Sequence, residues 1–278
     1  MSSMMGVVAL TVFLLVILAL EGNPAALWSG HAFVMVIGGS LVATLMSFPA
    51  GYLFKIPRLC WEAIRPPKLE LPLIVATLVK LADKLRMAGI QGIQKDISNL
   101  DDPFLRRGMQ YIAEGFDSQE IQDLLEAEML AIRQRHRTNI GVFESLGGFC
   151  PTMGILGTVV SMVAVLANLE RPETLGPQIA TAMVATLYGV GAANLVFLPM
   201  ATKLRKASEE ELRIRWVMVE IVLALQAGAH PRLIRERLKV SLPPSTRKLI
   251  QDLKGRRRQA AQSQPMEPEM AIPQYEEG

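Results

Sequence analysis

The stretch LGGFCPTMGILGTVVSMVAVLANL, residues 146–169, is followed after the short segment 170–176 by PQIATAMVATLYGVGAANLVFLPM, residues 177–200. Neither stretch contains Asp, Glu, Lys, Arg or His. A helix needs about 20 predominantly apolar residues to cross the hydrocarbon core of a bilayer. Because both stretches meet this length, the sequence predicts a pair of membrane-spanning helices joined by a short loop.

Two further apolar stretches, residues 4–20 and 32–54, predict two more spans. The composition agrees, because 50% of the 278 residues are hydrophobic and only 20% are charged. This balance argues against a disordered chain and against a soluble enzyme. The first stretch could also be a signal peptide, but no Lys or Arg precedes it, so a retained helix is the better interpretation. Cys60 and Cys150 fit no metal-binding spacing, and no cofactor or metal is expected.

The basic residues are distributed unequally between the segments that separate the spans. Of 29 Lys and Arg, 13 lie in residues 55–138, 15 lie from Lys203 onward, and only Arg171 lies elsewhere. Segments rich in Lys and Arg remain in the cytoplasm. The sequence therefore predicts that both termini and the segment 55–138 are cytoplasmic.

The predicted fold is an all-α polytopic membrane protein with four transmembrane helices, a helical cytoplasmic domain between the second and third, and a helical cytoplasmic tail. The predicted parts are the first two transmembrane helices (1–54), the cytoplasmic domain (55–138), the third and fourth transmembrane helices (139–202), the tail (203–258) and a disordered acidic C-terminus (259–278).

Local patterns predict where several cytoplasmic helices begin and end. Apolar residues repeat at helical spacing over 73–93, and the turn-forming sequence at 99–103 precedes a helix over 104–114. Asp117 and Glu120 have the spacing of a capping box, and the helix that they begin is expected to run directly into the third span.

The tail is expected to contain its own helix. Residues 208–211, Ser-Glu-Glu-Glu, predict a cap and a new helix start, and Gly228 predicts the end of that helix.

Small residues recur at helical spacing on the third and fourth predicted spans. They are Gly154, Thr158 and Ser161 on the third, and Ala182, Thr186, Gly189 and Ala193 on the fourth. Stripes of small residues allow helices in lipid to approach closely. From the spacing alone, simple helix packing and a pore-lining role are equally good interpretations.

Hydroxyls and prolines add to this pattern. Thr158 and Thr186 place hydroxyl groups in otherwise apolar helices, where they can contact an ion or water, although a threonine in a membrane helix often bonds its own backbone. Pro151 and Pro199, near the cytoplasmic ends of the two spans, predict bends or hinges.

None of the four spans contains an ionisable residue, which a proton or cation relay normally needs. If the chain conducts ions, a second protein must supply the carboxylate. The same absence argues against an enzyme, because the hydroxyls have no nearby base.

Several separate stretches together resemble the MotA/PomA family, the ion-channel subunits of the bacterial flagellar stator. They are AFVMVIGGSLVATLMSFP (32–49), DPFLRRG (102–108), EGFD (114–117), PTMGILGT (151–158), ATLYG (185–189), ANLVFLP (193–199) and QAGAHP (226–231). They occur in order between about residues 32 and 245.

The resemblance implies a multi-pass protein of the bacterial inner membrane, in which five copies surround a dimer of a single-span partner, MotB or PomB. The partner's membrane aspartate carries the ion, and ion passage turns the pentamer so that its cytoplasmic domain pushes the rotor protein FliG. By the same resemblance, Thr158 and Thr186 lie near the ion path, and Pro151 and Pro199 match the family's two important prolines.

Two features depart from the family pattern. An arginine followed eight residues later by a glutamate contacts the rotor, but here Arg86 is followed by the neutral Gln94. Possible substitutes are Asp101, Asp102, Arg106 and Arg107. Sodium-type members place threonine where this chain has Ala185, which favours protons as the coupling ion, whereas Thr158 favours sodium.

Two alternatives stay open. One is an ExbB/TolQ-type ion-driven energiser of outer-membrane processes, a group that generally has three spans. The other is a membrane scaffold or receptor that moves no ions.

Overall fold

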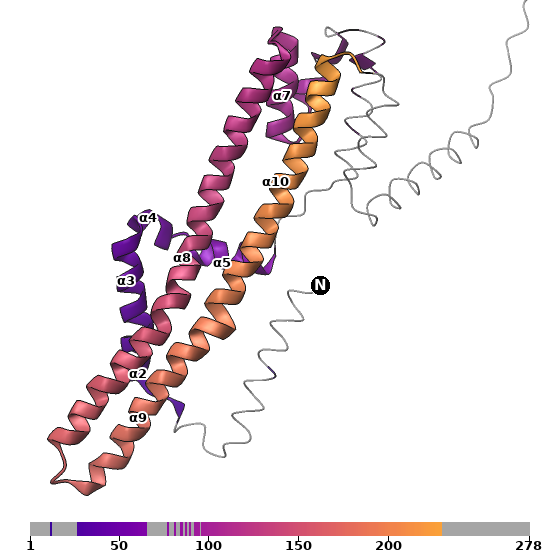
Figure 1. Cartoon of the computed structure of the whole chain (residues 1–278). Coiled ribbons are helices and arrows are strands. Elements are labelled where there is room, and N and C mark those ends of the chain that lie inside the picture. The colour runs from indigo at the N-terminus through magenta and orange to yellow at the C-terminus, as the bar shows by residue number, and fades with distance from the viewer. Residues whose placement is uncertain are drawn as a thin grey trace, which may run out of the picture. The chain divides into compact units, whose positions relative to one another are not determined.

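The computed structural model describes residues 27–65, 92–94 and 96–229, together with the single positions 12, 77, 81, 84, 85, 87 and 89. In this part of the chain every regular element is a helix (Figure 1), which agrees with the expected all-α class. The first predicted span and most of the predicted helix over 73–93 lie outside the described residues.

The second span consists of three consecutive helical segments. They are α2 (Gly30–Phe33), the wider π-helical segment η2 (Val34–Gly38) and α3 (Gly39–Ser47). The predicted span over 32–54 is too long at its C-terminal end, because Phe48 is extended (φ −133°, ψ 147°). The cause is Pro49, whose ring disfavours a helical backbone at the preceding residue. Two short helices follow, α4 (Ala50–Leu53) and α5 (Ile56–Ile64).

The helix α8 (Ser118–Ala167) is 50 residues long and contains the third span. It begins at the capping box that the sequence predicts. The Glu120 N–H donates to Asp117 Oδ1 (2.8 Å), and the Asp117 N–H donates to Glu120 Oε2 (3.1 Å). The helix continues through Pro151, so the polar helix and the third span form one element as expected.

The chain then turns back at residues 168–171 and continues as α9 (Pro172–Gly191), the π-helical segment η3 (Ala192–Phe197) and α10 (Leu198–Gln226), as Figure 1 shows. The predicted new helix start at Ser208 is wrong, because α10 passes through it without interruption. No Gly or Pro occurs between Met200 and Gln226, and this segment is rich in strong helix formers. The predicted end is confirmed, since Gly228 has a φ of +68°.

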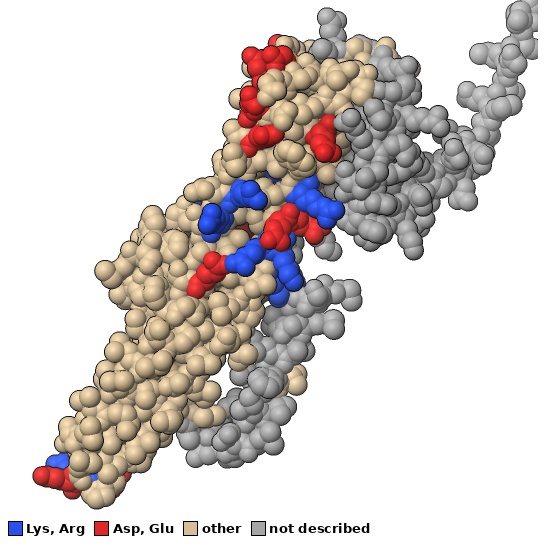
Figure 2. All heavy atoms as spheres, viewed as in Figure 1, with Lys and Arg blue, Asp and Glu red and all other residues tan. Residues whose placement is uncertain are grey.

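Three helices among the described residues are long and apolar enough to cross a membrane, over Gly30–Ser47, within Ser118–Ala167 and within Pro172–Gln226. Figure 2 shows an uncharged surface over α8 and α9 that is bordered by charged side chains at both ends. The chain is therefore a membrane protein.

Contacts divide the chain into two compact units. The first is drawn from Met1–Leu69 and Leu124–Arg215, and it contains the membrane helices. The second is drawn from Glu70–Asp123 and Trp216–Gly278, and it contains α7 (Pro103–Glu114). Asp102, which lies in the predicted turn, caps α7 by accepting the N–H groups of Phe104 (2.9 Å) and Leu105 (3.0 Å).

Candidate functional site

The helices α8 and α9 cross with their backbones in near contact at Gly154 and Gly189. A Cβ atom added to Gly189 would lie 2.5 Å from the Cys150 carbonyl oxygen and 3.1 Å from the Gly154 Cα. A Cβ added to Gly154 would lie 3.0 Å from the Ala185 carbonyl oxygen. Because these neighbours are backbone atoms, neither position has room for a side chain. The structure thus brings the two stripes of small residues together.

Thr158 and Thr186 meet beside this crossing. Their hydroxyl oxygens are 2.5 Å apart, and the Thr158 Oγ1 also lies 3.1 Å from the Gly154 carbonyl oxygen and 3.0 Å from that of Ala182. Both threonines are half-buried. Thr158 therefore bonds its own helix, as threonines in membrane helices commonly do, and the facing helix as well.

The two hydroxyls and the carbonyl oxygens of Gly154 and Ala182 can accept more hydrogen bonds than the two hydroxyl protons can supply. Each hydroxyl carries one hydrogen and two lone pairs, so Thr158 and Thr186 supply two protons between them. At least one hydroxyl lone pair is left to accept a hydrogen bond or to contact a cation. Two hydroxyls in contact can also accept a proton at one oxygen while releasing one from the other. The arrangement is an oxygen-rich point in a wall that is otherwise apolar.

The side chain of Ala185 lies buried in the contact between helices. Ala185 is 1% exposed, and a Cβ added to Gly157 would lie 3.1 Å from its Cβ and 3.5 Å from Met35 Cγ. Ala185 therefore sits where α8, α9 and η2 meet. It presents a methyl group at a junction that has little room for a larger side chain.

The remaining small residues occupy different surroundings. Ala182 is fully buried and contributes its carbonyl to the threonine pair, and Ala193 is fully buried in η3. Ser161 lies one turn beyond Thr158 and is half-buried.

The two prolines also differ in their surroundings. Pro151 is half-buried within α8, whereas Pro199 is exposed and is the second residue of α10, directly after η3. Because proline has no N–H and its ring crowds the preceding turn, a widened π-helical turn before Pro199 is physically consistent.

Large apolar side chains within one helical turn of Thr158 and Thr186 are exposed. Ile155 is 59% exposed, Val159 54%, Met183 59% and Leu187 53%. Exposed apolar side chains of this size on spanning helices suit lipid or another chain better than water.

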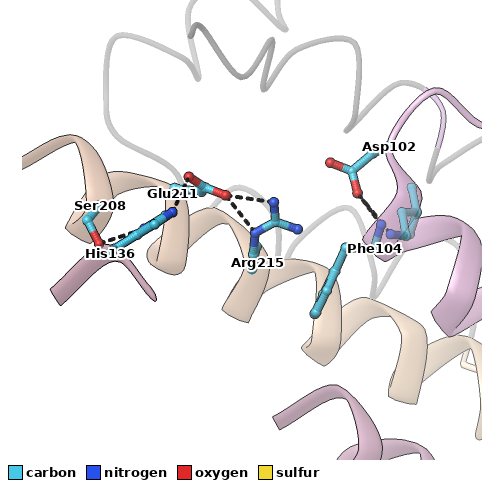
Figure 3. A network of polar contacts seen from close by, with 7 residues as sticks. Asp102, Phe104, His136, Ser208, Glu211 and Arg215 are labelled. Atoms are coloured by element: carbon cyan, nitrogen blue, oxygen red, sulfur yellow. Dashed lines mark hydrogen bonds and ion pairs between the residues drawn. The ribbon is translucent and has the colours of Figure 1, made fainter. Parts of the chain in front are cut away.

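A polar network that sequence reasoning missed joins α8 to α10 (Figure 3). His136 Nδ1 lies 3.0 Å from Ser208 Oγ, and His136 Nε2 lies 3.8 Å from Glu211 Oε2. Glu211 Oε1 accepts from Arg215 Nε (3.0 Å) and from its terminal nitrogen (2.6 Å). The signal was present in the sequence, because Ser208, Glu211 and Arg215 follow the i, i+3, i+7 spacing of one helix face.

Burial lowers the pKa of His136 from its ordinary value of 6.5, and this effect exceeds the opposing attraction of Glu211. Arg135 and Arg215 lower the pKa further, while Glu62 raises it. The imidazole is therefore neutral at pH 7. In this form one ring nitrogen can accept from Ser208 while the other carries the proton.

This shift predicts a pH-dependent stability. Below pH 6.5 the unfolded chain takes up a proton that the folded histidine resists, so stability is lost as the pH falls through 6.5 toward the lower folded pKa. The fall in Tm between about pH 7.5 and about pH 5.5 should be smaller for His136→Gln than for the wild type. Thermal unfolding of both proteins in the same detergent measures this difference. Equal falls would show that His136 does not contribute.

The residues expected to contact the rotor belong to the second unit, and all of them except Arg86 are among the described residues. Arg86 lies outside the described residues, and Gln94 is exposed. The neighbouring Asp96 forms an ion pair with Lys84 (2.8 Å). Two of the possible substitutes have structural roles, since Asp102 caps α7 and Arg106 donates to the Leu100 carbonyl oxygen (3.1 Å from Nε). Asp101 and Arg107 are exposed.

Comparisons with known proteins agree on one relationship. Residues 96–216 match the model of the MotA/TolQ/ExbB proton channel family. Uncharacterized protein YtxD of Bacillus subtilis is 37% identical over 209 residues, which cover 75% of this chain and 77% of that protein. Motility protein A of Treponema phagedenis is 32% identical over 232 residues, which cover 84% of this chain and 90% of that protein.

The fold has a counterpart among solved structures as well. The structure of the flagellar MotAB stator complex from Bacillus subtilis contains a chain that matches with a TM-score of 0.80 and 29% identity, over 88% of this chain and 96% of that one.

Proposed function

The chain belongs to the MotA/TolQ/ExbB proton channel family, and on that premise we propose that it is a flagellar stator subunit that couples ion flow to rotation of the flagellar rotor. The observation that carries this proposal is the contact between Thr158 and Thr186. It places an oxygen-rich point at the glycine crossing of two membrane helices. The family is a family of channels and not of enzymes, and the relatives named Motility protein A support the stator.

The proposed partner is a single-span protein of the MotB/PomB type that supplies a membrane aspartate. Two observations support it. The spanning parts of α8 and α9 contain no ionisable residue, so the ion needs a carrier from another chain. The side chains of Ile155, Val159, Met183 and Leu187 are also exposed and apolar, and a partner helix packed against them would bury them. The related solved structure is a MotAB complex.

We further propose a homopentamer around a partner dimer, with four spans and both termini in the cytoplasm of the inner membrane. The distribution of Lys and Arg supports this orientation. In this assembly the second unit faces the rotor protein FliG. Arg86, which matches the family's rotor-facing position, and the exposed Asp101 and Arg107 are the proposed charged contacts with the rotor.

Pro151 and Pro199 are proposed hinges between the membrane helices and the cytoplasmic parts. Pro199 has the stronger support. It directly follows the widened turn of η3, and a π-helical turn can convert to an α-helical one with a rotation of the helix beyond it.

The proposed coupling ion is the proton. A dehydrated metal cation needs several oxygen ligands, whereas a proton needs one acceptor at a time. The crossing offers two hydroxyls and two carbonyl oxygens. These carbonyl oxygens already accept hydrogen bonds from Thr158, and Ala185 adds only a buried methyl group.

Swimming speed against external sodium at fixed pH tests the function and the ion together. The host is a stator-deleted flagellated strain that expresses this chain with its cognate partner. We expect motility that does not depend on sodium and is lost when the proton gradient is collapsed. Speed that rises from near zero with sodium would overturn the proton proposal. No motility, with both proteins present in the membrane, would favour an ExbB/TolQ-type energiser.

A further inference from the structure

Tyr188 joins two parts of the chain that are far apart in sequence. Its phenol O–H donates to the Leu27 carbonyl oxygen (2.6 Å), and its oxygen accepts from the Ser29 N–H (3.3 Å). Tyr188 lies on α9, two residues after Thr186, while Leu27 and Ser29 precede α2. One phenol therefore satisfies two backbone groups of a segment 159 to 161 residues away.

These backbone groups lie at the entrance to a spanning helix. Ser29 is the N-cap of α2, and its side chain accepts the Ala32 N–H (3.3 Å). Backbone groups that enter hydrocarbon without a partner are costly, so a bond from a neighbouring helix holds this entrance in place. Aromatic packing supports the same position, since the Phe33 ring meets the Tyr188 ring edge-on at 6.4 Å.

The position of α2 determines what lies against the ion-path helices. Ala32 and Val36, from α2 and η2, belong to one buried cluster with Val184 and Ala185 of α9. Met35 of η2 faces Gly157, at the junction that Ala185 completes. A shift of α2 along α9 would therefore repack the residue next to Thr186.

We propose that Tyr188 is a positioning residue, whose hydroxyl fixes α2 and η2 against α9 and thereby keeps Thr158 and Thr186 in register. It contacts no ion itself. The proposal rests on the stator function proposed above. It assigns a specific role to the phenol oxygen, separate from the packing of the ring.

The substitution Tyr188→Phe removes the hydroxyl and keeps the ring, so it separates the two contributions. The host is the same stator-deleted strain with the cognate partner, and the measurement is the stepwise rise in rotation speed of single motors as stator units join. The height of a step reports the torque of one unit, and the number of steps reports assembly. We expect step height to fall about fivefold or more for Tyr188→Phe, because the variant loses both hydrogen bonds of the phenol, with the number of steps unchanged.

Tyr52→Phe is the matched control, because it removes a phenol hydroxyl from α4 outside this junction and should leave both quantities unchanged. Full step height in Tyr188→Phe, with or without fewer steps, would overturn the positioning role, since a residue needed only for folding changes the number of working units. Absence of steps with the wild-type chain would overturn the stator function instead.

Discussion

Gly189→Ala is expected to abolish motility, whereas Gly191→Ala, two residues further along α9, is expected to preserve it. The alanine Cβ at position 189 would lie 2.5 Å from the Cys150 carbonyl oxygen, which is a backbone atom of a long helix and cannot rotate away. The helices must then separate. A Cβ at position 191 meets nothing within 4 Å. The cost of overpacking at such a contact is about 1–3 kcal/mol.

The functional effect should exceed the loss of stability. Moving α9 away from α8 also separates the hydroxyls of Thr158 and Thr186, which are 2.5 Å apart in the close-packed arrangement. Swimming in soft agar, together with the membrane level and Tm of each variant, checks the prediction. A motile Gly189→Ala strain would show that the crossing is not needed for function. Loss of motility in Gly191→Ala as well would point to a general intolerance of this helix.

Thr158→Val is expected to reduce ion flux by about ten- to a hundredfold, the range that a lost hydrogen bond to a charged group implies. Valine has nearly the shape of threonine, so the helices can stay packed while the hydroxyl that reaches Gly154, Ala182 and Thr186 is lost. The flux is measured in proteoliposomes that hold the chain and its partner under an imposed proton gradient.

Thr152→Val is the matched control on the same helix, because the exposed Thr152 hydroxyl bonds only the Phe149 carbonyl oxygen (2.8 Å) among the contacts described. The double variant Thr158→Val/Thr186→Val should be little worse than Thr158→Val, since the two hydroxyls act as one pair. Wild-type flux in Thr158→Val would exclude the pair from the ion path. Strictly additive losses would show two independent sites.

Much of the fold could be predicted because its causes are local. Uncharged stretches of sufficient length identified the spans within α8 and α9. The Asp117–Glu120 capping box marked the start of α8, and the turn sequence at 99–103 preceded α7. Gly228 marked the end of α10 because a positive φ favours glycine.

The same local reasoning failed where a distant residue changes the role of a local signal. Serine is a common helix N-cap, but the hydroxyl of Ser208 forms a hydrogen bond with His136, 72 residues away, and the helix continues. Asp102 and Arg106 are charged residues that suit a surface contact, yet both form hydrogen bonds with backbone groups near the start of α7. A sequence pattern shows what a side chain can do, and its neighbours decide which of those roles it takes.

The candidate site shows the same division. The sequence by itself determined that small residues and two threonines lie at helical spacing on the two uncharged spans, because periodicity and hydropathy are properties of each segment alone. Only the tertiary structure decided that Thr158 and Thr186 share a hydrogen bond, that Ala185 faces Gly157, and that Tyr188 bonds the backbone at the start of α2. These contacts join residues 28 to 161 positions apart. They depend on how each helix is rotated about its axis and shifted along its neighbour when the helices pack.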